Sequence, residues 1–164
     1  MAPVAGPVDT DAAGPPRPPD ELDRRLIRLL QQDGRMSVRA LAEAVHISRA
    51  SAYARLTRLV EDGVISGFGA RVDPERLGFA TSAYITLEIE QNSWRTVREQ
   101  LLELPGVEHM ALVSGGFDVV LLVRAVDNRA LRELVFQHIQ PMRYVRSTRT
   151  LLIFDESDRG PTLP

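Results

Sequence analysis

The chain has no cysteine and no lysine, and charged residues interrupt every apolar stretch well before about 18 residues. Without cysteine, a disulfide framework, a thiolate zinc site and a catalytic thiol are excluded. Without a long apolar stretch, no segment is expected to span a membrane. The first residues lack the apolar core of a signal peptide, so we expect a cytoplasmic protein. All 20 basic residues are arginine, which we attribute to the base composition of the coding sequence.

The length of 164 residues and the hydrophobic share of 44% are enough for one ordinary domain or two small ones. The formal net charge is −2, and taken alone this argues against a nucleic-acid-binding protein. The distribution of the charges along the chain decides that question.

Two regions of different periodicity lie between two tails. Residues 1–19 hold six of the eleven prolines and few large aliphatic side chains, so we predict a disordered tail there. Helical spacing marks residues 20–70 as a first domain, followed by a linker over residues 71–79. Apolar runs that alternate with helices mark residues 80–155 as a second domain, and residues 156–164 form a second tail.

Three short helices are expected in the first domain. Each begins after a capping residue, and these residues are Asp20, Ser37 and Ser48. A tight turn at His46-Ile47 separates the second helix from the third, which is expected over residues 48–62. This arrangement is typical of a helix-turn-helix. The segment 64–72 that follows is expected to form a strand.

The second domain is expected to follow the order β-α-β-β-α-β. Strands are predicted around residues 85–90 and over 107–114, 117–125 and 144–154, and the intervening helices are predicted to begin at the capping residues Ser93 and Asp127. The second of these helices would place His138 on its apolar face, as a core or interface residue. This is the ferredoxin-like arrangement, with both helices on one sheet face, so the fold class is α+β. The other face would be bare, which predicts self-association.

The basic charge is concentrated on the second and third helices. Residues 35–60 contain five arginines and a single acid, Glu43, which gives a local charge of +4. From residue 64 onward the balance is reversed. The mild overall acidity therefore conceals a basic surface of the kind that contacts phosphate.

The third helix presents small side chains opposite its buried stripe, with Tyr53 and Arg55 at the borders. Small residues let a helix approach base edges closely, and an arginine can reach guanine or phosphate. The predicted DNA-binding residues are Arg35, Ser37, Ser48, Arg49, Ala50, Ser51, Ala54, Arg55 and Arg58. The sequence does not choose between Arg49 and Arg58 for a base contact. Two alternatives stay open: the arginines form a solvated surface, or Arg55 stabilises the domain by pairing with a carboxylate.

Several motifs in order resemble one family. They are Leu22-Asp23, Asp33-Gly34-Arg35, Leu41-Ala42, Ile47-Ser48, Arg55-Leu56, Arg58-Leu59, Gly63-Val64-Ile65, Asp73-Pro74, Leu77-Gly78, Val113-Ser114-Gly115-Gly116-Phe117-Asp118 and Ser147-Thr148-Arg149-Thr150. Over residues 20–155 the chain resembles the Lrp/AsnC (feast/famine) transcriptional regulators. The resemblance implies a winged helix-turn-helix followed by a ferredoxin-like effector (RAM) domain. It also implies dimers, often assembled into octamers, that bind double-stranded promoter DNA.

The resemblance further implies that an amino acid or a related metabolite binds beside the glycine-rich turn, between dimers. The effector-binding residues it implies are Ser114, Gly115, Gly116, Phe117 and Asp118, with Thr148 and Thr150. A turn without Cβ atoms lets a ligand approach the backbone, and a carboxylate there can pair with an ammonium group. The alternative is an ordinary hairpin that Asp118 caps.

Four residues depart from the family pattern. His46 stands where the family usually has glycine, a place that often needs a positive φ, so we expect local strain. Ser114 replaces the commoner threonine and keeps its hydroxyl. Arg143-Tyr144 stands where many members have Pro-Gly, so the turn and the floor of the ligand site are expected to differ.

No catalytic or metal site is predicted. His46, His109 and His138 lie in separate elements, no pair has metal-ligand spacing, and no nucleophile is paired with a base. We therefore expect no enzyme activity and no cofactor. One enzymatic alternative is a two-domain, family-like decarboxylase of the sirohaem type, because His109 lies near a histidine position of those enzymes. Another alternative is an architectural DNA-binding protein that responds to no effector.

Overall fold

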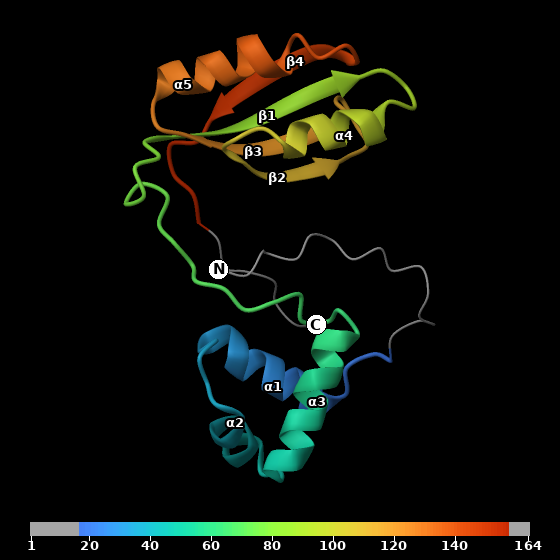
Figure 1. Cartoon of the computed structure of the whole chain (residues 1–164), viewed down its shortest axis with the longest axis vertical. Coiled ribbons are helices and arrows are strands. Elements are labelled where there is room, and N and C mark those ends of the chain that lie inside the picture. The colour runs from blue at the N-terminus through green and yellow to red at the C-terminus, as the bar shows by residue number, and fades with distance from the viewer. Residues whose placement is uncertain (1–16, 158–164) are drawn as a thin grey trace. The chain divides into compact units, whose positions relative to one another are not determined.

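The computed structural model describes residues 17–157, and within them the chain divides into two compact units, one ending at Ala70 and one beginning at Arg71 (Figure 1). Most of both predicted tails, residues 1–16 and 158–164, lies outside the described residues. No helix within residues 17–157 has the length and apolar character needed to cross a membrane.

The first unit consists of three helices: α1 (Glu21–Gln32), α2 (Val38–Val45) and α3 (Arg49–Glu61). The predicted caps are confirmed, since the side chains of Asp20, Ser37 and Ser48 each accept a hydrogen bond from a backbone N–H three residues later. Leu26, Leu41 and Val45 form the core between the helices.

The turn between α2 and α3 depends on His46. Its φ of 59° and ψ of 48° place it in the left-handed region, as expected for a residue at a position that usually needs glycine. The backbone N–H of Ile47 then donates to the carbonyl of Ala42 at 3.0 Å and closes the turn. The helix-turn-helix predicted from the sequence is therefore formed.

The strand predicted over residues 64–72 is wrong. The structure has no strand there, because this segment has no partner strand within the described residues to accept its backbone hydrogen bonds. Near α3, the Ile65 N–H donates to the carbonyl of Leu59 at 2.9 Å.

The second unit has the predicted β-α-β-β-α-β order. Its elements are β1 (Thr81–Ile89), α4 (Trp94–Leu102), β2 (Val107–Leu112), β3 (Val119–Ala125), α5 (Asn128–Glu133), the π-helix η1 (Leu134–Ile139) and β4 (Val145–Leu152). The strands form one antiparallel sheet in the order β2-β3-β1-β4. With the helical first unit, this confirms the α+β class. The strands β2 and β3 are shorter than predicted because residues 113–118 form the turn between them.

One face of the sheet carries the core, and both helices cover it (Figure 1). Ile85 and Leu87 of β1, Leu121 of β3 and Val97 of α4 have no exposed surface. The opposite face lacks such a cover within the unit, and the cross-strand pair Tyr84 and Leu151 remains 40% and 49% exposed. The bare face predicted from the sequence is therefore present.

Two local predictions in this unit are wrong. Ser93 precedes α4, but its side chain does not cap the helix, because its hydroxyl donates to the carbonyl of Glu90 at 2.6 Å. His138 is exposed in this chain, so its prediction as a core residue is wrong and Ile139 takes the buried position instead, while a role at an interface stays a prediction. The cause is the π-helical turn, in which the Gln140 N–H donates to the carbonyl of Val135 and shifts the phase of the helix.

Candidate functional site

The N-terminal half of α3 exposes both small and long side chains. Arg49, Ala50, Tyr53 and Ala54 in its N-terminal half are exposed, and Tyr53 has 63% of its surface accessible. Ser51 is half-buried, and the Ser48 hydroxyl accepts the Ser51 N–H at 3.1 Å. The Ser37 hydroxyl has the same role at α2, where it accepts the Ala40 N–H at 3.2 Å. The N-terminal half of α3 therefore offers a surface of small side chains flanked by Arg49 and Tyr53.

The C-terminal half of α3 is tied to α1 by ion pairs. One guanidinium nitrogen of Arg55 lies 2.7 Å from Asp20 Oδ2 and 2.8 Å from Asp23 Oδ1. Arg58 pairs with the other oxygen of Asp23, whose side chain has no exposed surface. The hydrogen bond from Arg55 lowers the pKa of the Asp20 carboxyl from 3.8 to about 2. These contacts favour the alternative in which Arg55 stabilises the domain, and a DNA contact by Arg55 or Arg58 stays a prediction.

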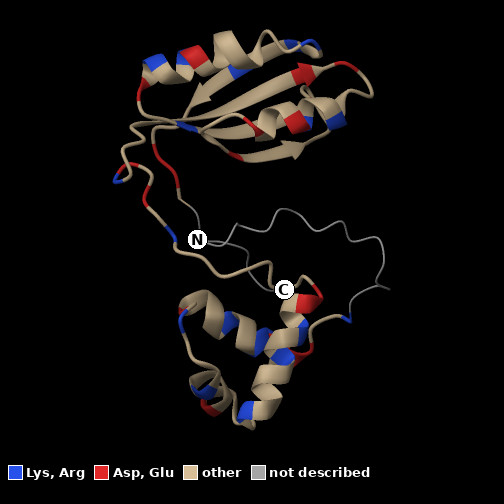
Figure 2. Cartoon of the chain, viewed as in Figure 1, with Lys and Arg blue, Asp and Glu red and all other residues tan. Residues whose placement is uncertain are grey.

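Other arginines of the first unit keep their charge at the surface, and Figure 2 shows basic positions on all three helices. Arg39 pairs with Glu43 at 2.9 Å in an exposed contact between residues four apart, which partly offsets its charge. Arg35, between α1 and α2, is exposed, and its backbone N–H donates to Asp33 Oδ1 at 2.9 Å. Arg35 and Arg49 are thus exposed cations near the two ends of α2.

The glycine-rich turn between β2 and β3 is anchored to β1 by Asp118. Its Oδ2 accepts the N–H of Ile89 at 2.8 Å, and its own N–H donates to the carbonyl of Leu87 at 2.9 Å. The carboxylate thus takes a β1 backbone N–H just beyond the last residue pair between β1 and β3, Leu87 with Val119. Asp118 therefore fixes the turn to a neighbouring strand, which differs from the simple hairpin cap considered from the sequence.

A cavity of about 180 Å³ opens beside this turn. Of the predicted effector residues, Gly116, Phe117 and Thr148 line it, whereas Ser114, Gly115, Asp118 and Thr150 do not. The Thr148 hydroxyl accepts a hydrogen bond from the Gln140 side chain at 2.9 Å, which connects β4 to the end of η1. The structure thus brings together part of the predicted set around one small cavity.

The cavity also contains two charged residues that the sequence reasoning missed, Glu88 of β1 and Arg149 of β4. Glu88 is paired with Ser147, and Arg149 with Thr86, so both side chains lie on the bare sheet face as diagonal neighbours. Both are exposed, and neither is in an ion pair within residues 17–157. Alternation along each strand is visible in the sequence, but the register that brings these two charges together is not.

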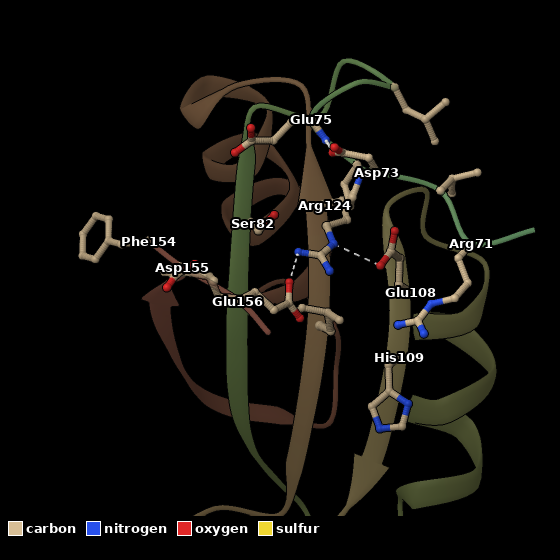
Figure 3. A pocket seen from close by; sticks show the side chains of 15 residues that line it. Arg71, Asp73, Glu75, Ser82, Glu108, His109, Arg124, Phe154, Asp155 and Glu156 are labelled. Carbon is tan, nitrogen blue, oxygen red and sulfur yellow. Dashed lines mark hydrogen bonds and ion pairs between the residues drawn. The ribbon is translucent and has the colours of Figure 1, made fainter. Parts of the chain in front are cut away.

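A larger cavity of about 920 Å³ lies at the other end of the same face (Figure 3). There Arg124 is only 9% exposed and binds Glu108 at 3.0 Å and Glu156 at 2.6 Å. Burial alone would lower the pKa of Arg124, and the hydrogen bonds to Glu156 and Glu108 raise it above its usual value. His109 lines the same cavity. Within the described part of the chain, no group of three His, Asp or Glu side chains is placed to hold a metal ion.

Comparisons with known proteins identify both units. Residues 19–66 match the family model for winged helix-turn-helix DNA binding, and residues 82–163 match that of the Lrp/AsnC ligand binding domain. An uncharacterized HTH-type transcriptional regulator of Pyrococcus abyssi is 33% identical over 134 residues, which cover 82% of this chain and 85% of the relative.

Two solved structures resemble the whole fold. The leucine response regulatory protein (LrpA) of Mycobacterium tuberculosis is 32% identical, with a TM-score of 0.79 over 88% of this chain and 99% of that one. The transcriptional regulator NMB0573 of Neisseria meningitidis, solved in complex with L-Met, is 21% identical. Its TM-score is 0.82, over 90% of this chain and 97% of that one.

Proposed function

Since the chain belongs to the Lrp/AsnC family of transcriptional regulators, we propose that it binds promoter DNA through α3 and responds to an amino acid or a related metabolite. The general function, a helix-turn-helix regulator with a ligand-binding domain, follows from the family. The DNA contacts, the class of effector and the assembly are the parts proposed. Residues 20–70 would act as the DNA-binding domain and residues 80–155 as the sensing domain, joined by a linker over 71–79.

The DNA-binding part of the proposal rests on the exposed N-terminal half of α3 and on the free cations around it. The proposed contacts are made by Arg35, Ser37, Ser48, Arg49, Ala50, Ser51 and Ala54. Small side chains allow close approach to base edges, and backbone N–H groups at the start of a helix favour phosphate. Arg55 and Arg58 contribute by holding α3 against α1 through Asp23.

The sensing part is carried by a single observation: unpaired charges of opposite sign, Glu88 and Arg149, line the cavity beside the glycine-rich turn. A free amino acid carries an ammonium and a carboxylate close together, so this pair complements it. Gly116 lets the ligand approach the backbone, and Phe117 adds an apolar wall. Thr148 borders the same cavity, and the family resemblance adds Ser114, Gly115, Asp118 and Thr150, which do not line the cavity of a single chain. That the related Neisseria protein was solved with L-Met supports this class of ligand.

Self-association would cover the bare face of the sheet and complete the ligand site. Exposed apolar residues on this face, including Tyr84 and Leu151, support contact with a second copy. We propose a dimer, with dimers assembling toward an octamer and the effector bound between dimers. A ligand shared between copies stabilises one assembly over another, and this changes how the DNA-binding domains are presented.

A thermal-shift screen of the twenty amino acids and related keto acids tests the sensing part. We expect one chemical class to raise the melting temperature, since a ligand that binds only the folded state stabilises it. The same ligand should change DNA affinity or the sedimentation coefficient. Stabilisation with neither change would contradict effector action, and an architectural DNA-binding protein predicts no response at all. Tight, coloured binding of a tetrapyrrole would instead revive the decarboxylase alternative, for which His109 is the candidate residue.

A further inference from the structure

The ion pairs of α3 divide its long polar side chains into two groups. Arg55 and Arg58, in the C-terminal half, are 28% and 30% exposed, and their guanidinium groups bind the carboxylates of Asp20 and Asp23. The Nε of Arg58 is buried and, among the described residues, has no hydrogen-bond partner. Moving either guanidinium toward DNA would leave the buried carboxylate of Asp23 with one cation fewer, which is costly.

The second group consists of Arg49 and Tyr53. Both are exposed, and neither makes a hydrogen bond or an ion pair within residues 17–157. They are four residues apart, so their side chains form one ridge along the helix. Ala50 and Ala54 form the neighbouring ridge at the same spacing, and both are exposed. A helix with this surface can enter a groove deeply on its alanine side while the longer side chains reach outward.

We propose that Arg49 and Tyr53 determine which DNA sequence α3 prefers, and that Arg55 and Arg58 do not contact the bases. The inference rests on the proposed function of α3 and makes it more specific. In a helix-turn-helix, the N-terminal residues of the recognition helix contact the base edges, and Arg49 and Tyr53 lie in its first one and a half turns. Arg49 suits the two acceptors of guanine, whereas the Tyr53 ring suits a thymine methyl and its hydroxyl suits a phosphate.

The test uses the full chain and a random double-stranded DNA library, from which the wild type selects a preferred site. The affinity for that site over a scrambled one is then measured for Arg49→Ala, Tyr53→Ala and Tyr53→Phe. Arg25→Ala is the matched control, because it removes the same charge from an exposed position on α1. We expect Arg49→Ala and Tyr53→Ala to reduce the preference about tenfold each, and Arg25→Ala to leave it unchanged. Unchanged melting temperatures will show that these variants fold.

Tyr53→Phe separates the ring from the hydroxyl: a retained preference with weaker overall affinity assigns the base contact to the ring and the phosphate contact to the hydroxyl, and a lost preference means that the hydroxyl itself contacts a base edge. Full preference in both Arg49→Ala and Tyr53→Ala would overturn the proposal while leaving DNA binding by the protein intact. The proposal is equally overturned if the control loses as much preference as the α3 variants. Failure of the wild type to select any site would overturn the proposed function itself.

Discussion

Asp23 of α1 lies with its Oδ1 2.8 Å from a guanidinium nitrogen of Arg55 in α3, and its side chain has no exposed surface. The two residues are 32 positions apart in the sequence. The capping box with Asp20 holds the same carboxylate at the start of α1, so one buried group joins the beginning of the domain to α3. This buried ion pair therefore fixes the orientation of α3 relative to α1.

Replacement of Asp23 should destabilise the first unit strongly. Asp23→Asn removes the negative charge that two arginines share, and breaking a buried ion pair in this way costs about 3 kcal/mol. Urea unfolding followed by far-UV circular dichroism measures the loss. Trp94 lies in the second unit, so the transition followed by its fluorescence should not move.

Glu21→Gln is the matched control for this variant, since it removes the exposed pair with Arg28 at 2.7 Å. Exposed pairs contribute about 1 kcal/mol at most, so the control should remain near wild-type stability. Equal effects of Asp23→Asn and Glu21→Gln would contradict the assigned role of Asp23.

Lowering the pH should remove the contribution of Asp20 to the free energy of unfolding. Its pKa is lowered to about 2 in the folded state, so the stability it adds is present above the unfolded value of 3.8 and is lost as the pH falls toward 2. Because Asp20 is more than one-third exposed, screening limits this contribution to about 1 kcal/mol. Asp20→Asn keeps the helix cap and removes the charge. The unfolding free energies of wild type and variant should converge between about pH 4 and pH 2. A difference that does not depend on pH would argue against the ion pair as its source.

His46 should be replaceable by glycine with a gain in stability. Its left-handed backbone costs an L-residue about 1 kcal/mol relative to glycine, and His46→Gly removes that cost. The neighbouring change Ala44→Gly, inside α2, should instead destabilise by about 1 kcal/mol. Thermal unfolding of both variants measures the gain of stability expected for His46→Gly and the loss expected for Ala44→Gly. A loss of stability in His46→Gly would mean that the imidazole makes a compensating contact.

Loss of either charge in the small cavity should weaken amino-acid binding without affecting folding. Glu88 and Arg149 line the cavity, and Glu88→Gln and Arg149→Gln would each remove one charge-assisted hydrogen bond to the proposed ligand, which is expected to reduce affinity about tenfold or more. Isothermal titration with the amino acid found in the screen provides the measurement. Arg146→Gln is the control, because Arg146 is an exposed arginine on β4 that does not line the cavity. Equal losses of affinity in all three variants would mean that binding depends on the net charge of the protein and not on a specific site.

Asp118 can be tested for two roles separately. Asp118→Asn keeps an oxygen that accepts the Ile89 N–H, whereas Asp118→Ala leaves that group unsatisfied at a cost of about 1–3 kcal/mol. We expect Asp118→Asn to fold like the wild type and, if the carboxylate pairs with the ligand ammonium, to lose the response to the effector. A full response in Asp118→Asn would restrict Asp118 to its structural role.

Local features of the fold were predictable from the sequence. The caps Asp20, Ser37, Ser48 and Asp127 depend on a hydrogen bond to a residue three positions away, and the order of elements follows from hydrophobic periodicity. Ser93 was predicted wrongly as a cap because its hydroxyl has a competing acceptor in the carbonyl of Glu90. His138 was misplaced because a π-helical turn changes the periodicity on which the prediction relied.

Long-range relationships were not predictable in the same way. The pairing of Arg55 with Asp23 requires the packing of α3 on α1, and the sequence could offer it only as an alternative. The meeting of Glu88 and Arg149 requires the register between β1 and β4. In both cases the sequence showed the types of residue, but only the three-dimensional fold showed which residues lie together.

In the proposed function, one chain binds DNA with α3, and a ligand held beside the glycine-rich turn changes this binding. The most direct test is a fluorescence-anisotropy titration of the selected DNA site with the full chain, with and without the amino acid that stabilises it. We expect salt-dependent binding whose affinity changes by at least about fivefold when the ligand is present. Identical binding curves with and without a ligand that demonstrably occupies the protein would contradict it.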